Sequence, residues 1–204
     1  VEPLLLKQSS SEIIKNSTKT YSEYFLTVLR LLRASKVEGD IAWQGAKKLI
    51  NFPEYQYTCI GYAGISNGGS GLGREFNEKI LHRAKEMIEI SRDEPEILPF
   101  LALLEDGIGG DRISDMTQKI IDKEICEYTV DIMKKIDFQG ELRQYETEKY
   151  EKYYLPYNPY SKCVLKLLPQ DILSNLPLAD SFDTWTLEVA EHNARLRNRI
   201  NKDL

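Results

Sequence analysis

Apolar side chains recur at helical spacing along one stretch more clearly than anywhere else in the chain. Five residues there are separated by four, three, four and four positions and so share one helical face: Ile121, Ile125, Tyr128, Ile132 and Ile136. Charged side chains fill much of the remaining surface. The pattern predicts a long amphipathic helix, with Ser114 as its N-cap and Asp115 in its first turn.

The same periodicity predicts helices in other parts of the chain. One covers about residues 12–34. A second covers 40–50, with Asp40 as N-cap, and four of its apolar residues are expected to face inward: Ile41, Ala46, Leu49 and Ile50. Trp43 is expected to pack in the core or at an interface. Weaker helical patterns cover residues 76–88, 96–104 and 183–202.

Two stretches have the composition of β structure. Residues 56–65 are β-branched and aromatic, which predicts a strand. Farther on, a turn sequence at 157–162 separates two extended apolar runs, 153–155 and 163–168, and so predicts a β-hairpin that ends at Pro169. The expected fold is therefore mainly α with a small antiparallel β element, an α+β fold. We expect residues 1–204 to form a single compact domain of a larger protein, with a hairpin-containing insert at 141–169.

Composition narrows the class of protein. The chain has 204 residues, 42% of them hydrophobic, which is enough for one ordinary core. A net charge of -5 is unusual for a protein that coats nucleic acid, although a local basic face stays open. Because no apolar run approaches the roughly 20 residues that span a bilayer, no membrane association is expected.

Cysteine usage indicates the compartment. Cys59, Cys126 and Cys163 are far apart, and with two histidines they form no zinc-binding spacing. We expect reduced, mostly buried thiols in a cytoplasmic protein. A cysteine nucleophile paired with a histidine is the alternative.

An acidic, glycine-rich loop precedes the long predicted helix and is the main candidate site. We expect Asp106, Asp111 and Asp115 to be held close together by a tight loop that contains Gly107, Gly109 and Gly110. Carboxylates of this kind are the ligands that Mg²⁺ or Mn²⁺ prefers, and a bound cation activates water and neutralises a phosphate. Arg112 is placed to hold a phosphate oxygen. The structural alternative is that Asp111 or Ser114 caps the helix and that Arg112 pairs with a carboxylate.

A second glycine-rich segment, residues 66–73, follows the predicted strand and precedes a helical pattern. That order is typical of loops that bind phosphate through backbone N–H groups. However, the segment has neither a Walker lysine nor a G-x-G-x-x-G pattern, which favours a flexible connection.

Three segments resemble those of uncharacterised families of intracellular bacterial proteins. The first is Gly-Gly-Asp-Arg-Ile-Ser-Asp-Met-Thr at 109–117, and the second is Pro-Gln-Asp-Ile-Leu at 169–173. The third is a spaced pattern near the end of the chain: Asn193, Leu196, Arg197, Ile200 and Asn201. The resemblance implies a setting in mobile elements and anti-phage defence, where nucleases are common. It assigns no catalytic residue.

Two functions from different classes are therefore expected. The first is a metal-dependent nuclease in which Asp106, Asp111 and Asp115 bind the cation and Arg112 binds phosphate; its partner would be nucleic acid. Against it, the chain lacks the usual strand-borne carboxylate–lysine pattern of nucleases. The alternative is a non-catalytic interaction module of a larger defence or regulatory protein, with a partner surface in the tyrosine-rich segment 145–160.

Overall fold

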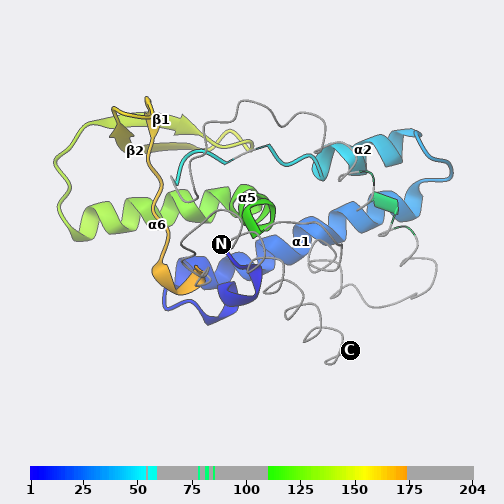
Figure 1. The fold of residues 1–204 in the computed structure, drawn as a ribbon, viewed down its shortest axis with the longest axis horizontal. Coiled ribbons are helices and arrows are strands. Elements are labelled where there is room, and N and C mark those ends of the chain that lie inside the picture. The colour runs from blue at the N-terminus through cyan, green and yellow to red at the C-terminus, as the bar shows by residue number, and fades with distance from the viewer. Residues whose placement is uncertain (54, 59–77, 79–80, 83–84, 86–109, 174–204) are drawn as a thin grey trace, which may run out of the picture. The chain divides into compact units, whose positions relative to one another are not determined.

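The computed structural model describes residues 1–53, 55–58, 78, 81–82, 85 and 110–173, with side chains omitted for 110–112 (Figure 1). The chain divides into two compact units. Unit 1 comprises Val1–Tyr21, Glu54–Tyr62 and Ser114–Ser174, and unit 2 comprises Ser22–Pro53, Ala63–Ile113 and Asn175–Leu204.

Helix α1 spans Glu12–Ala34, as predicted, and follows a short 3-10 helix, η1, at Pro3–Gln8. Its buried residues are spaced by three or four positions, which defines a single inward stripe. In unit 1 the stripe includes Ile14, Ser17 and Tyr21, and in unit 2 it continues with Phe25, Val28 and Leu32. The amphipathic pattern of the sequence was therefore a sufficient signal for this helix.

In unit 2, helix α2 spans Ile41–Leu49 and begins at the predicted N-cap. The backbone N–H of Trp43 donates to Oδ1 of Asp40 at 2.8 Å. Trp43 is buried, as expected for a core residue, and so are Ala46 and Ile50. The prediction that Ile41 faces inward is wrong: this side chain is 93% exposed. Ile41 lies two positions before Trp43 and hence on the opposite side of the helix.

The long predicted helix is two helices. Helix α5 spans Gly110–Ile120 and α6 spans Asp122–Lys135, with a break at Ile121 (φ -98°, ψ 24°). The predicted N-cap at Ser114 is wrong because α5 begins four residues earlier. For the same reason Asp115 does not lie in the first turn, and Asp111 lies in the helix rather than in the preceding loop. The apolar stripe extends back to the buried Ile113, and packing of such a stripe supplies most helical stability.

A three-stranded antiparallel sheet follows α6. Strands β1 (Leu142–Glu146), β2 (Lys152–Asn158) and β3 (Cys163–Val164) are ordered β1-β2-β3. The β2–β3 pair confirms the predicted hairpin, but β3 ends at Val164, whereas the second strand was predicted to run to residue 168. Strand β1 was not predicted, and it pairs with β2 so that Tyr145 lies opposite Tyr153 and Gln144 opposite Tyr154.

One face of the sheet packs on α6 (Figure 1). Leu155 of β2, Val164 of β3 and Cys126 of α6 form the buried centre of this packing, with Tyr145 and Tyr153 against it. A second 3-10 helix, η3, spans Gln170–Ile172 after the sheet. The Asp171 carboxylate accepts hydrogen bonds from Ser9 and Ser10, which fixes η3 to the segment that follows η1.

The described residues confirm a mainly α protein with a small antiparallel sheet. Of the predicted strand at 56–65, residues 56–58 are described, and they form no strand. Glu78, Leu81, His82 and Lys85 are helical, in agreement with the third predicted helix. The glycine-rich loop at 66–73 and the helices predicted at 96–104 and 183–202 lie outside the described residues. The single compact domain stays a prediction.

None of the helices that the structure describes is both long enough and apolar enough to cross a membrane.

Candidate functional site

The predicted acidic site falls partly within the described residues. Asp111, Arg112 and Asp115 all belong to helix α5. Asp111 and Asp115 are four positions apart and therefore lie on the same helical face. Asp106 is outside the described residues, as are the side chains of Asp111 and Arg112, so the convergence of the three carboxylates stays a prediction. Among the described residues, no group of three or more His, Cys, Asp or Glu side chains is arranged to hold a metal ion.

The described part of unit 1 contains a different polar cluster, centred on Lys166. This lysine follows β3 and is only 1% exposed. Its Nζ donates hydrogen bonds to Oδ1 of Asp122 and, at 3.0 Å, to the hydroxyl of Tyr55. Lysine is almost never fully buried unless it is paired. The ion pair with Asp122 is therefore what permits this position.

Asp122 joins the cluster to helix α6. Its carboxylate lies in the first turn of α6, where the helix dipole favours a negative charge. Besides Lys166, the hydroxyl of Tyr55 donates to Oδ1, and the hydroxyl of Tyr145 donates to Oδ2 at 2.9 Å. Three donors thus satisfy one carboxylate, which offsets the free-energy cost of burying its charge.

Three tyrosine rings surround the ammonium group of Lys166. Nζ lies 3.5 Å from the ring centroid of Tyr145, 4.3 Å from that of Tyr57 and 5.1 Å from that of Tyr55. The Tyr57 ring meets the other two edge to face, at centroid distances of 5.3 Å and 5.2 Å. Such rings attract a cation through their negative faces. We call Lys166, Asp122, Tyr55, Tyr57 and Tyr145 the lysine cage.

Burial controls the protonation of the groups in and beside the cage. Burial raises the pKa of Tyr55 and Tyr145, and the nearby charge of Asp122 raises both further, so both phenols stay neutral. Burial lowers the pKa of Lys166, an effect that Asp122 opposes by stabilising the charged form. Burial also raises the pKa of Cys126 to about 12, so this thiol stays protonated.

These features indicate that the lysine cage stabilises the fold through a buried ion pair and is not a reactive centre. The lysine side chain is closed to solvent and bonded to its carboxylate. The Cys126 thiol is not activated as a nucleophile, because nucleophilic attack requires a thiolate. The cage instead joins four segments that are distant in sequence: the residues around Tyr55, helix α6, strand β1 and the segment after β3.

Sequence reasoning missed the cage, although one signal was present. Lys166 is a single lysine in the apolar run 163–168, which was predicted to be a strand. In the alternation of such a strand it lies on the same face as Val164. An inward lysine demands a buried counter-charge. The sequence did not identify that counter-charge, because the chain has 32 aspartate and glutamate residues and only the tertiary fold brings Asp122 to Lys166.

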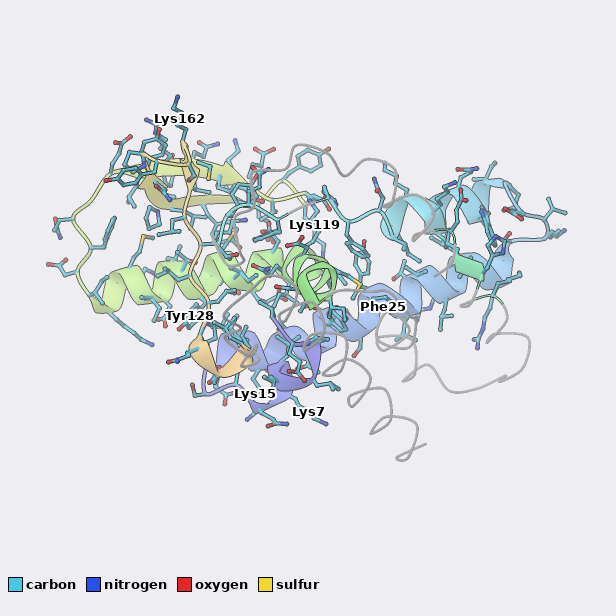
Figure 2. All side chains as sticks on the ribbon, in the orientation of Figure 1. Lys7, Lys15, Phe25, Lys119, Tyr128 and Lys162 are labelled. Carbon is cyan, nitrogen blue, oxygen red and sulfur yellow. The ribbon has the colours of Figure 1, made fainter. Side chains whose placement is uncertain are left out.

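The tyrosine-rich segment divides into two groups. Tyr145, Tyr153 and Tyr157 contact other side chains through a packed cluster or the Arg143 guanidinium. The other three are exposed: Tyr150 (81%), Tyr154 (60%) and Tyr160 (95%). Tyr160 lies in the same exposed turn as Lys162, whose side chain points away from the sheet in Figure 2.

The backbone conformation of Tyr150 is also unfavourable. It occupies the left-handed region with φ 63°, in the turn that joins β1 to β2. Only glycine, and to a lesser extent asparagine and aspartate, adopts this conformation readily. A glycine at this position is therefore expected to make the protein more stable than the tyrosine does.

Comparison with known proteins gives a family and no function. No curated protein and no solved structure matches the chain. A family model described as a domain of unknown function, DUF8370, matches residues 1–180. Because that match covers most of the chain, the protein belongs to the DUF8370 family.

Proposed function

We propose that this chain is a non-catalytic interaction module of a larger bacterial defence or regulatory protein, located in the cytoplasm. One observation carries the proposal: Tyr150, Tyr154 and Tyr160 are exposed on the turns and outer face of one small sheet. The defence setting rests on the resemblance of residues 109–117 to bacterial proteins of that kind.

Tyrosine is suited to such a surface for physical reasons. It offers a large contact area and a hydroxyl while losing only two side-chain torsions on binding, and it is enriched at interfaces and their hot spots. The left-handed backbone at Tyr150 adds support, since strained residues concentrate where function requires them.

The lysine cage supports the proposal by fixing the sheet beneath these tyrosines. Tyr145 of β1 and Lys166 after β3 both bond to Asp122 of α6. The sheet is thus tied to the helix on both sides of β2. A rigid surface binds more tightly because less conformational freedom is lost in the complex.

The proposal is tested by site-specific photo-crosslinking of the full chain in cells that express it naturally. A benzophenone amino acid replaces Tyr150, Tyr154 or Tyr160, each in a separate variant, and replaces the exposed Ile41 of unit 2 in a matched control. The expected result is one discrete adduct with the same protein from the tyrosine positions and no such adduct from Ile41. Mass spectrometry identifies the partner.

Two results would overturn the interaction module. Absence of a discrete adduct at all three tyrosine positions would remove the surface. The same adduct at Ile41 and at the tyrosines would show that crosslinking reports random collision.

A metal-dependent nuclease is the second candidate, favoured by the spacing of carboxylates on α5. Asp111 and Asp115 share one helical face, and Arg112 adjoins them. With Asp106 they would hold Mg²⁺ or Mn²⁺, which would activate a water molecule toward a phosphodiester bond while Arg112 binds a phosphate oxygen.

The nuclease is tested with plasmid DNA and RNA in the presence of Mg²⁺ or Mn²⁺. Wild type is compared with Asp111→Ala and Asp115→Ala, and thermal unfolding of each variant is recorded to separate lost activity from lost fold. Cleavage that both substitutions and EDTA abolish would support this candidate. Absence of cleavage by wild type, or equal cleavage by the variants, would eliminate it.

A further inference from the structure

Strand β1 lies at one edge of the sheet, and its hydrogen-bonding pattern is fixed by the residues that flank it. Tyr157 N donates to Glu141 O, and Thr147 N donates to Glu151 O, both at 2.9 Å. In an antiparallel ladder the bonded pairs alternate with non-bonded ones. The alternation directs the backbone N–H and C=O groups of Leu142, Gln144 and Glu146 away from β2.

These outward groups form an open edge. Within the described residues, no hydrogen bond involves the backbone of Leu142, Gln144 or Glu146 beyond the sheet, and all three side chains are exposed. Unpaired strand edges are templates for another strand. An edge with three outward-facing residues is long enough to accept one.

We propose that a second copy of this chain pairs with β1 along this edge, antiparallel and about a two-fold axis at Gln144. Outward-facing residues must pair with outward-facing residues for the ladder to form. The register centred on Gln144 is the one that pairs all five residues of both β1 strands. Leu142 then lies opposite the partner's Glu146, and Gln144 lies opposite the partner's Gln144.

Charge disfavours two of the other registers. Shifting the axis to Arg143 or to Glu146 would place like charges directly opposite each other, which destabilises a strand pair. With the axis at Gln144, Arg143 lies opposite the partner's Tyr145, and no like charges meet. Each Glu146 also keeps Lys152 of its own copy nearby, at 3.9 Å.

A symmetric pair of this kind closes after two copies, because each edge satisfies the other. It joins two three-stranded sheets into one of six strands. The pairing is through the backbone of β1 and requires none of Tyr150, Tyr154 or Tyr160, so it is independent of the proposed partner surface.

The experiment uses the two-fold axis, where Gln144 meets itself. The mass of the full chain in solution is measured by light scattering over a range of concentrations, for wild type, Gln144→Lys and Gln144→Glu. We expect a dimer for wild type and a monomer for each variant, because each places like charges at the axis. An equimolar mixture of the two variants is expected to restore a dimer that contains one copy of each.

The matched control is Tyr154→Lys. It places the same charge on the same face of the sheet, one strand farther from the axis, and is expected to remain dimeric. Circular dichroism checks that every variant is folded.

Three results would overturn the proposal: a monomeric wild type at all concentrations, a mixture of charge variants that stays monomeric, or loss of the dimer in Tyr154→Lys. The first would also be the result if the edge accepts a peptide from another protein. The last would assign self-association to the tyrosine surface instead.

Discussion

Lys166 and Asp122 form an ion pair in a part of unit 1 that is closed to water. Burying two charges costs several kcal/mol for each ion, and their attraction offsets that cost only when hydrogen bonds complete the geometry. Here the hydroxyls of Tyr55 and Tyr145 supply those bonds to Asp122. The pair therefore matters for stability mainly because removal of either partner would leave one uncompensated charge in the buried site.

We predict strong coupling between these two residues. Lys166→Met and Asp122→Asn are each expected to lower the free energy of unfolding by about 3–5 kcal/mol, because each leaves a buried group unpaired. The double variant is expected to be more stable than either single variant, since the introduced asparagine would still accept from a tyrosine hydroxyl and no charge remains. Urea unfolding measures all four proteins. If the two losses of unfolding free energy simply add in the double variant, the predicted coupling between Lys166 and Asp122 is contradicted.

Tyr150 makes the opposite contribution. Relieving its left-handed backbone with Tyr150→Gly is expected to raise the free energy of unfolding by about 1 kcal/mol. The control, Tyr154→Gly on the regular part of β2, is expected to lower it by about 0.5–1 kcal/mol. Thermal and urea unfolding report both values. Equal destabilisation of both glycine variants would contradict backbone strain at Tyr150.

At the scale of single elements, helices were predicted where one face alone is buried. The stripe of α1 and the Asp40 cap of α2 are local signals, and both gave the observed bounds. The break between α5 and α6 was missed because the apolar spacing continues through Ile120, Ile121 and Ile125 without interruption. Asp122 and Glu124, two acids in the first turn of α6, were the local sign of a second start.

The cap of α2 predicts a dependence on pH. The N–H of Trp43, followed by those of Lys36 and Val37, stabilises the charged carboxylate and lowers the pKa of Asp40 to about 2. A lowered pKa means that the cap contributes stability above the unfolded-state pKa, near 4, and loses it as the pH falls toward 2. Carbon-13 NMR titration of the Asp40 carboxyl checks the value. Titration near pH 4 would contradict the cap, and Asp40→Asn identifies the signal.

Only the β2–β3 part of the three-stranded sheet was predicted. The β2–β3 hairpin has a clear turn sequence, whereas β1 is rich in charged and polar residues and its turn carries Tyr150 where a glycine would have been the usual sign. The pairing of β1 with β2 is stabilised by packing on α6, which a local pattern does not contain.

At the scale of the whole molecule, sequence spacing placed the candidate acids but not their surroundings. Asp111 was predicted in a loop before the helix, whereas the structure assigns it, with Asp115, to α5. The lysine cage could not be predicted from sequence spacing. Its members come from segments separated by up to 111 residues, and only the tertiary fold brings them together.

We propose that the sheet of unit 1, which the lysine cage fixes to α6, presents three tyrosines to a partner. If the sheet served only as part of the unit 1 core, substitutions of the exposed tyrosines would leave the affinity for the crosslinked protein unchanged.

The most direct test is therefore the affinity of the full chain for the protein identified by crosslinking, measured by calorimetry. The triple variant Tyr150→Ser, Tyr154→Ser, Tyr160→Ser is expected to bind at least about 100-fold more weakly, since interface hot spots each contribute about 2 kcal/mol or more. The matched control replaces three other exposed apolar residues, Val37→Ser, Ile41→Ser and Ile136→Ser, and is expected to bind like wild type. Equal affinity of the tyrosine variant and wild type would contradict the account.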